Sequence, residues 1–449
     1  MSAIRFRSTN GAAPAVGLRE ALLAGQAPDR GLYEPERCPV FSPSDRAEFA
    51  RLTYAEIAFR VLRPYALGSI PEELLAVYCR EAYDFPVPIE RVDEGRHVLR
   101  LDRGPTASFK DFAARMMARM LGGFVRETGR PVVILTATSG DTGSAVANAF
   151  HGIDGIRVLV LFPEGEVSEC QRRQMTTLGG NIRTVAMAGT FDDCQALVKR
   201  AFADPELERL PLSSANSINI GRLLPQSVYY FYAASRLVAA EEPIVFSVPS
   251  GNFGDMMGAV LAGRMGLPLC RLVVPVNAND EFPRFLATGE YTPVVPSRPC
   301  LSNAMNVGHP SNLARLVSAY GGRMDEAGRI HGAPDLEAMR RALFSISVSD
   351  GATRQTILEA WTRRRLLLEP HGAVGWRGLL EYQAAGSPAG PAVVLETAHP
   401  AKFPAEMESL LGFRPEPPPA LAALDGLPEE YDRLPADWAV FREYLLAWA

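Results

Sequence analysis

A lysine placed between a Gly-Pro turn and a helix is the clearest candidate for chemistry in this sequence. Residues 103–112 read Arg-Gly-Pro-Thr-Ala-Ser-Phe-Lys-Asp-Phe, and Lys110 stands where the turn gives way to the helix. The apolar residues at helical spacing around it are Phe109, Phe112, Ala113, Met116, Met117 and Met120. Because burial disfavours an ammonium ion, we expect Lys110 to have a depressed pKa, which an amine needs to form a Schiff base with an aldehyde.

Two loops of small residues each follow an apolar run and precede a helix-like stretch. The first loop, Thr136–Gly143, follows Val132–Leu135, and the second, Ser250–Asp255, follows Ile244–Val248. Such a loop directs backbone N–H groups and the positive end of a helix at an anion. A further polar segment, Thr397–Phe403, also follows a strand-like run, and open α/β sheets bind ligands at the carboxyl ends of strands. One lysine or one glycine loop alone is weak evidence for a functional site, but the four segments together predict a single site.

With these segments in this order, the chain resembles the threonine synthases of the longer type, which carry an added N-terminal region. The segments that carry the resemblance are Gly104–Phe112, Thr136–Gly143, Ser214–Leu224, Ser250–Asp255, Leu301–Met305, Glu369–His371 and Thr397–Phe403. The resemblance implies a fold-type-II enzyme, similar to the tryptophan synthase β chain, with pyridoxal 5′-phosphate as cofactor and Lys110 as the catalytic, cofactor-binding lysine. The implied reaction is γ-elimination of phosphate from O-phospho-L-homoserine, followed by β-addition of water to give L-threonine.

The resemblance also indicates which residues hold the cofactor. The backbone N–H groups of Gly251, Asn252, Phe253 and Gly254 are expected to bind its phosphate, because glycine lets the backbone approach an anion closely. Thr397 matches the family position whose hydroxyl meets the pyridine nitrogen.

The loop after the first strand has two possible roles. The N–H groups around Ser139 and Gly140 can bind the α-carboxylate of the substrate, as at other helix N-termini. Asp141 can instead, or also, lie near the hydroxyl of the cofactor, and Thr142 can donate to the substrate phosphate.

A second phosphate site is expected at Asn216 and Arg222, the positions that match the family here. Arginine suits phosphate because its guanidinium is permanently charged and fork-shaped, although Arg222 could instead form an ion pair on a helix flank. A carboxylate beside a phosphate would repel it, so Asp255 is interpreted as a helix cap whose side chain turns away. His371 and His399 are interpreted as structural, hydrogen-bonding histidines.

Three residues depart from the family pattern. Arg103 stands where histidine is usual, Glu396 where a small residue is usual, and Asn306 where aspartate is common. Since Arg103 and Glu396 both flank strand ends, they could form a compensating ion pair. The departures leave open an alternative function: a paralogous pyridoxal-phosphate dependent lyase, or a β/γ-replacement enzyme acting on a related amino acid. A non-catalytic relative is disfavoured because Lys110 and both loops are kept.

Composition narrows the remaining classes of protein. The chain has 449 residues, 47% hydrophobic and 22% charged, with a net charge of -5, which is typical of a globular enzyme and not of a nucleic-acid-binding protein. We find no apolar run of the roughly 18 residues that a membrane helix needs. The six cysteines and six histidines are scattered. We therefore expect reduced thiols, a cytoplasmic protein and no metal site.

The pattern of elements predicts three regions. Residues 1–95 are expected to form a helical N-terminal domain, and residues 96–414 the cofactor-binding core, with a smaller mobile subdomain at about 130–215. Residues 415–449 are expected to be a linker and a C-terminal helix. The chain is expected to be a monomer or a homodimer.

Strands and helices alternate in the predicted core, which indicates parallel sheets flanked by helices. The predicted strands are 97–101, 132–135, 157–162, 181–187, 244–248, 271–276 and 392–395. In the N-terminal region, Leu18–Leu23 and Arg46–Leu62 carry apolar residues at helical spacing, with Pro64 expected to end the second helix.

Overall fold

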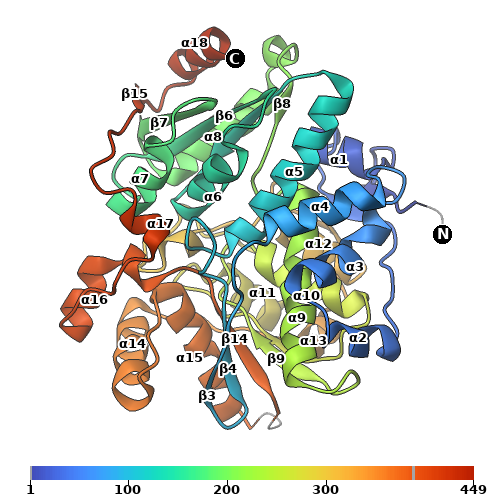
Figure 1. Cartoon of the computed structure of the whole chain (residues 1–449), viewed down its shortest axis with the longest axis vertical. Helices are drawn as coiled ribbons and strands as arrows, with labels where there is room; N and C mark the ends of the chain where they lie inside the picture. The colour runs from blue at the N-terminus through green and yellow to red at the C-terminus, as the bar shows by residue number, and fades with distance from the viewer. Residues whose placement is uncertain (1–2, 387–389) are drawn as a thin grey trace.

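Two sheets of mostly parallel strands form the framework of the protein (Figure 1). The computed structural model describes residues 3–386 and 390–449. The larger sheet has the strand order β13 (Leu343–Phe344), β10 (Leu269–Val273), β9 (Ile244–Ser247), β14 (Ala392–Glu396), β4 (Arg96–Arg100) and β3 (Ile89–Asp93), in which β3 runs antiparallel to β4. The smaller sheet has the order β15 (Asp432–Pro435), β7 (Ile182–Ala188), β6 (Ile156–Pro163), β5 (Val132–Ala137) and β8 (Leu212–Ser213), with all pairs parallel.

Helices cover both sheets, as parallel strands require. They are α5 (Lys110–Thr128), α6 (Asp141–Phe150), α7 (Glu169–Thr176), α8 (Phe191–Ala203), α9 (Ser227–Leu237), α10 (Gly254–Arg264), α11 (Glu281–Thr288), α12 (Leu313–Ala319), α13 (Leu336–Ala342), α14 (Asp350–Arg364), α15 (Pro370–Ala384) and α16 (Pro404–Leu411). Helix α8 packs on β5 and β6, and α15 packs on β14 and β9. All residues of β5 and β14 are buried. Each predicted strand is present within three residues, so the predicted α/β fold with parallel sheets is confirmed.

The N-terminal region is mainly helical, with α1 (Leu18–Ala24), α2 (Pro43–Phe49), α3 (Tyr54–Ala66) and α4 (Glu72–Ala82). A short antiparallel pair, β1 (Phe6–Ser8) and β2 (Tyr33–Pro35), was not predicted. The single helix expected at Arg46–Leu62 is wrong, because Thr53 caps a new helix there and forms a capping box with Glu56. Pro64 lies inside α3 and does not end it.

The C-terminal segment is more than a linker and a helix. After α17 (Pro419–Ala422), strand β15 joins the smaller sheet beside β7, and α18 (Trp438–Trp448) follows as a helix of 11 residues. A second short antiparallel pair, β11 (Arg323–Met324) and β12 (Ile330–Gly332), lies outside both sheets. The predicted domain bounds and the mobility of the smaller subdomain stay predictions. Among the described residues, no helix is long and apolar enough to cross a membrane.

One buried arginine fastens the N-terminal region to the rest of the protein. Arg315 on α12 is only 1% exposed and donates to the carbonyl oxygen of Tyr33 from Nε at 3.0 Å and from an Nη atom at 2.8 Å. Its other donors reach the carbonyl oxygens of Ser217 at 3.0 Å and Ile218 at 2.6 Å, and the side chain of Asn312 at 2.6 Å. Burial lowers the pKa of Arg315 to about 9, opposed by the charge of Glu34. This one side chain therefore positions the segment that enters the site at residues 216–218.

We predict that Arg315→Met lowers the free energy of unfolding by about 3 kcal/mol, because three buried carbonyl oxygens lose their donors. Urea denaturation followed by circular dichroism measures the change. The control is Arg341→Met, which removes a side chain that is 70% exposed and paired with Glu337 at 3.7 Å. A surface pair of that kind contributes about 0.5 kcal/mol or less. Equal stability of the two variants would contradict the fastening role.

Candidate active site

Lys110 is the first residue of α5, and the turn before it is tied to the residues that follow β14. The N–H of Phe109 donates to the carbonyl oxygen of Thr397 at 2.9 Å, and the N–H of His399 donates to that of Ala107 at 3.0 Å. Two of the predicted segments, far apart in sequence, therefore lie side by side. Asp111 closes the turn that precedes the helix, since its carboxylate accepts from the N–H and the hydroxyl of Thr106 at 2.8 and 2.6 Å.

The amine of Lys110 lies in an environment that disfavours its charge. Burial lowers the pKa of Lys110 to about 8, with Arg222 and Lys402 lowering it further against the opposing charges of Asp141 and Asp255. Its Nζ lies 4.4 Å from the centre of the Phe109 ring. This environment agrees with the expected depression of the pKa, so part of Lys110 is a neutral nucleophile near neutral pH.

A cavity of about 90 Å³ lies in front of this amine. The predicted site residues on its wall are Lys110, Ser139, Asp141, Thr142, Asn216, Arg222, Gly251, Asn252, Phe253, Gly254 and Thr397. Gly140 is the one predicted residue that is not on this wall. It lies behind the turn, where a side-chain carbon would come within 2.4 Å of Gln171.

The loop after β9 has the geometry of an anion cradle. In the described part of the chain, no protein oxygen accepts a hydrogen bond from the N–H groups of Gly251, Asn252, Phe253 or Gly254. Phe253 carries the left-handed backbone, with φ of 60°, and packs its ring on Phe282. At Gly251 a side-chain carbon would come within 2.7 Å of the Cα of Met305, so close backbone approach requires glycine there. Four unpaired N–H groups in one loop fit a phosphate.

The side chain of Asn252 holds this loop in place and is not free for a ligand. Its Nδ2 donates to the hydroxyl of Ser217 at 2.8 Å, and its Oδ1 accepts from the N–H of Ser311 at 2.6 Å. Asn312 also donates to the Asn252 carbonyl oxygen at 2.9 Å. The predicted use of the backbone at Asn252 is therefore the one that this geometry allows.

The loop after β5 is shaped by Thr138. The hydroxyl of Thr138 accepts from the N–H groups of Gly140 at 2.9 Å and Gly143 at 2.8 Å. The hydrogen bonds within the loop leave the N–H groups of Ser139, Asp141 and Thr142 without an acceptor among the described residues. A carboxylate fits these donors at the positive end of α6.

Lys402 is a site residue that the sequence reasoning missed. It is fully buried and its Nζ lies 2.7 Å from Asp141 Oδ1, which also accepts from Gln171 Nε2 at 3.0 Å. Burial alone would raise the pKa of Asp141, but Lys402 and Lys110 outweigh it and hold that pKa well below its usual range. The Thr397–Phe403 motif contained Lys402, yet nothing in its spacing pointed to a partner far away in the chain.

Arg222 is a buried guanidinium without a carboxylate partner. It is 3% exposed, one Nη donates to the carbonyl oxygen of Ala215 at 2.5 Å, and its Nε has no hydrogen-bond acceptor in the described residues. Burial lowers the pKa of Arg222 to about 10, against the charges of Asp111 and Tyr229. The ion pair considered for Arg222 is absent among the described residues. Asn216 lies near it on the cavity wall and donates to the Ala137 carbonyl oxygen at 2.9 Å.

The prediction that Asp255 caps α10 is wrong. Phe253 occupies the cap position, and the Asp255 carboxylate instead accepts from the hydroxyls of Tyr229 at 2.5 Å and Tyr230 at 2.6 Å. Burial raises the pKa of Asp255 to about 6, although both tyrosines and Lys110 favour its charged form. The side chain that caps a helix belongs to the residue before its first turn, and Asp255 is already in that turn.

The suggested ion pair between Arg103 and Glu396 is also wrong. Arg103 lies 3.4 Å from Asp102, whereas Glu396 lies 3.6 Å from Arg100. Burial raises the pKa of Glu396 well above its usual range, and the neighbouring Glu369 raises it further. The strand pairs these residues differently because Arg100 and Glu396 are direct neighbours in register on β4 and β14.

None of the three departures from the family pattern lies on the cavity wall. The third, Asn306, braces a loop: its Oδ1 accepts from Asn277 Nδ2 at 3.0 Å and from the N–H of Cys300 at 3.1 Å. All three residues therefore lie outside the wall of the space in front of Lys110.

Both histidines have hydrogen-bond partners within the protein, and His371 also lies on the wall of the cavity in front of Lys110. His371 Nδ1 lies 2.5 Å from Glu369, and its Nε2 accepts from the N–H of Ala304 at 3.1 Å. His399 Nδ1 accepts from the N–H of Ala401 at 3.1 Å. Burial lowers the pKa of His399 to about 4, helped by Arg103.

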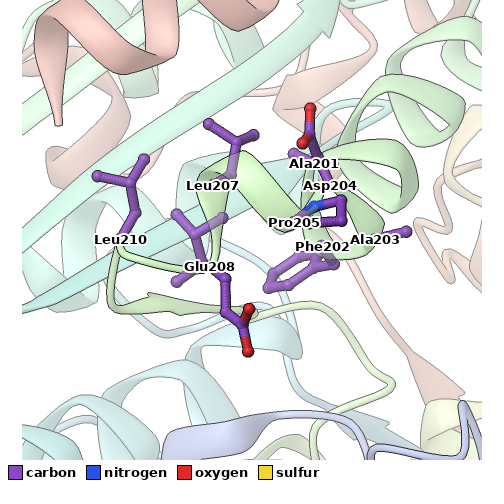
Figure 2. A pocket seen from close by; sticks show the side chains of 9 residues that line it. Ala201, Phe202, Ala203, Asp204, Pro205, Leu207, Glu208 and Leu210 are labelled. Carbon is purple, nitrogen blue, oxygen red and sulfur yellow. The ribbon is translucent and has the colours of Figure 1, made fainter.

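Two other cavities do not include Lys110 on their walls. One, of about 370 Å³, lies at the turn η1 (Pro205–Leu207) and is lined mainly by apolar side chains such as Phe202 and Leu210 (Figure 2). It holds no amine and no glycine loop. The other, of about 650 Å³, adjoins the site, and we call it the vestibule. The two spaces share Ala137, Gln195, Asn216 and Asn252, and other vestibule walls include Arg30, Lys199, His309, Asp325 and Glu326.

Comparison with known proteins agrees with this geometry. The family "Pyridoxal-phosphate dependent enzyme" matches residues 94–397, "Threonine synthase N terminus" matches 5–83, and "Threonine synthase, C-terminal" matches 372–445. The chain is 40% identical to the threonine synthases of Pseudomonas aeruginosa, over 98% of both chains, and of Escherichia coli, over 96% of both. Its fold is similar to that of the PLP-bound threonine synthase of Brucella melitensis, with a TM-score of 0.91, 36% identity and 99% of both chains covered.

We predict that Lys110 reacts with amine reagents with a midpoint near pH 8, because only the neutral amine reacts and its fraction rises with pH through the pKa. Trace acetylation of the cofactor-free protein between pH 6 and pH 11, read by mass spectrometry, gives the profile. A lysine peptide, with a pKa of about 10.4, is the internal standard. A profile for Lys110 that follows the standard would contradict the depressed pKa.

We predict that Lys402→Met costs about 3–5 kcal/mol of stability, because Asp141 is then buried without its partner. In the native protein the pKa of Asp141 is depressed, so its contribution is present above the unfolded pKa of about 3.9 and is lost as the pH falls. In the variant that pKa rises, so the gap in stability should widen from pH 4 to pH 7. The double variant Asp141→Asn with Lys402→Met is the control and should recover part of the loss. A gap that does not change with pH would exclude this ion-pair account.

Proposed function

The chain belongs to the threonine synthase family of pyridoxal-phosphate dependent lyases, and on that premise we propose how its residues form L-threonine and phosphate from O-phospho-L-homoserine and water. The proposal rests on one observation: an amine with a lowered pKa lies on the same cavity wall as two separate anion-binding sites. The amine is that of Lys110, and the anion sites are the N–H groups of residues 251–254 and the guanidinium of Arg222. A phosphorylated cofactor and a phosphorylated substrate together need two such sites.

The residues present fit pyridoxal phosphate. The N–H groups of residues 251–254 would hold its phosphate, and Lys110 would hold its aldehyde carbon. Thr397 would meet the ring nitrogen, since its hydroxyl makes no hydrogen bond to another described residue. When bound, the cofactor draws electrons away from the substrate Cα, which makes loss of the Cα and Cβ protons possible.

The chain's own groups then do three things. Arg222 and Asn216 bind the substrate phosphate, and the N–H groups of Ser139 and Thr142 bind its α-carboxylate. These contacts fix the two ends of the substrate, so that its Cα and Cβ protons lie near one base. Lys110 would move those protons, because its amine lies on the same cavity wall and in an environment that favours the neutral, proton-accepting form.

Asp141 has a supporting role in this scheme. The alternative in which it lies near the cofactor hydroxyl is compatible with its place on the cavity wall. Its carboxylate already accepts from Lys402 and Gln171, so it is held charged and oriented. A fixed negative charge beside Lys110 also favours return of a proton to that amine after substrate leaves.

A small hydrophilic substrate must be shielded from premature attack by water, and we propose that the smaller sheet moves to close the site. In this arrangement Gln171 of α7 reaches Asn303 at 3.2 Å, and Asp192 of α8 reaches Ser297 at 3.1 Å. Both contacts link the predicted mobile subdomain, residues 130–215, to loops of the larger sheet. The cytoplasmic location and the monomer or homodimer state stay predictions.

We predict that the purified protein with pyridoxal phosphate converts O-phospho-L-homoserine to equal amounts of phosphate and threonine. Lys110→Ala should lower the rate about a thousandfold or more, because both the cofactor attachment and the proton transfer are lost. A phosphate assay and amino-acid analysis of the same sample provide the measurement. Phosphate accompanied by a keto acid would instead indicate the paralogous lyase, and near-normal threonine formation by Lys110→Ala would contradict the role of that lysine.

A further inference from the structure

The sequence uses lysine at three positions only, Lys110, Lys199 and Lys402, although Lys and Arg together number 46. Two of the three lie at the active site, in front of the cavity and in the buried ion pair with Asp141. The third, Lys199, lines the vestibule that adjoins that cavity. Lys199 is therefore the one lysine of the sequence that lies outside the active site, on the wall of the space that adjoins it.

Lys199 is the unpaired charge of the vestibule. It makes no hydrogen bond, ion pair or ring contact with another described residue. The other charged side chains of the vestibule have partners: Glu326 lies 3.4 Å from Arg30, and Asp325 lies 2.7 Å from His331. Glu326 is therefore compensated by Arg30, whereas the hydrogen bond from His331 leaves the Asp325 carboxylate charged, so the vestibule carries charges of both signs. Lys199 is the vestibule cation that has no partner among the described residues.

Lys199 faces into the vestibule. His309, on the opposite wall, has its pKa lowered first by burial and also by the charge of Lys199. The ring of His309 is not available for a hydrogen bond with Lys199. Its Nδ1 lies 2.6 Å from the Tyr291 hydroxyl, and its Nε2 lies 3.0 Å from the Glu326 carbonyl oxygen. Lys199 is thus an exposed cation that shares the vestibule wall with Asp325 and Glu326 and forms an ion pair with neither.

Gln195 lies one helical turn before Lys199 on α8 and continues the same face toward the active site. It lines both the vestibule and the active-site cavity, and its amide makes no hydrogen bond with a described residue. The side-chain ends of Lys199 and Gln195 lie on one face of α8. Together with Asn216 and Arg222 they form a series of groups that can bind phosphate, from the vestibule to the buried guanidinium.

We propose that Lys199, assisted by Gln195, binds the phosphate of the incoming substrate in the vestibule before that phosphate reaches Arg222. The proposal rests on the proposed function, since it is the phosphate of O-phospho-L-homoserine that would bind. Lys199 acts in this account as a positioning and specificity residue that does not touch the reacting carbons. A vestibule of about 650 Å³ has room for one small phosphorylated amino acid.

The test compares three single variants of the full-length holoenzyme. Lys199→Gln should raise KM for O-phospho-L-homoserine about three- to tenfold with kcat within about twofold, because loss of the first contact slows substrate association and leaves the bound complex unchanged. Lys199→Arg should restore KM to within about twofold of the native value. The matched control is Arg200→Gln, which removes the same charge from the next position, where Arg200 lies over the Trp438 ring at 4.6 Å. It should leave KM unchanged.

A second measurement does not depend on turnover. Inorganic phosphate should protect Lys199 from trace acetylation in the native protein, whereas chloride at the same ionic strength should not, with the label at each of the three lysines read by mass spectrometry. A native enzyme that makes threonine but shows no change in KM in Lys199→Gln, or the same change in Arg200→Gln, would overturn the proposal. Loss of threonine formation in the native protein would instead refute the proposed function, and phosphate protection would then decide the role of Lys199 alone.

Discussion

The buried ion pair between Lys402 and Asp141 is the interaction on which the site depends. Lys402 follows β14 of the larger sheet, and Asp141 follows β5 of the smaller one, so their contact of 2.7 Å joins the two sheets at their carboxyl ends. Both side chains are almost fully removed from water. Isolated charges in such a place would be very costly, so the pair stabilises this arrangement of the two sheets around Lys110.

This arrangement also sets the chemistry of Lys110. Its amine lies among two other cations, Arg222 and Lys402, and two carboxylates, Asp141 and Asp255. Because Asp141 is already compensated by Lys402, and Asp255 is held by two tyrosine hydroxyls, neither carboxylate forms an ion pair with Lys110. Burial therefore dominates, and the amine keeps a low pKa in a site that still needs charges to bind two anions.

The sequence was sufficient for those parts of the site that local structure determines. The strands that precede the loops at Thr138 and Ser250 read as apolar runs, and the small residues after them mark helix N-termini, so the anion cradles could be predicted. The partners of side chains that meet from distant parts of the chain could not be predicted. Lys402 and Asp141 are 261 residues apart, and Asp255 selects Tyr229 and Tyr230 only because α9 and α10 pack together. The wrong pairing of Arg103 with Glu396 has the same cause, since strand register decides which arginine lies opposite Glu396.

Arg222 explains how such a site can favour a phosphorylated substrate. Its Nε is buried without an acceptor, and an unpaired buried charge of this kind is unfavourable in the free protein. A phosphate dianion that reaches Arg222 satisfies both the charge and the orphaned donor, whereas an unphosphorylated amino acid of similar size leaves them unsatisfied. Discrimination therefore arises mainly from the cost of leaving a fixed group unpaired, and not from a closely shaped pocket. To bind there, the phosphate must lose part of its hydration shell before it reaches Arg222. Polar side chains of the vestibule, such as Gln195 and Asn216, can replace its water molecules one after another.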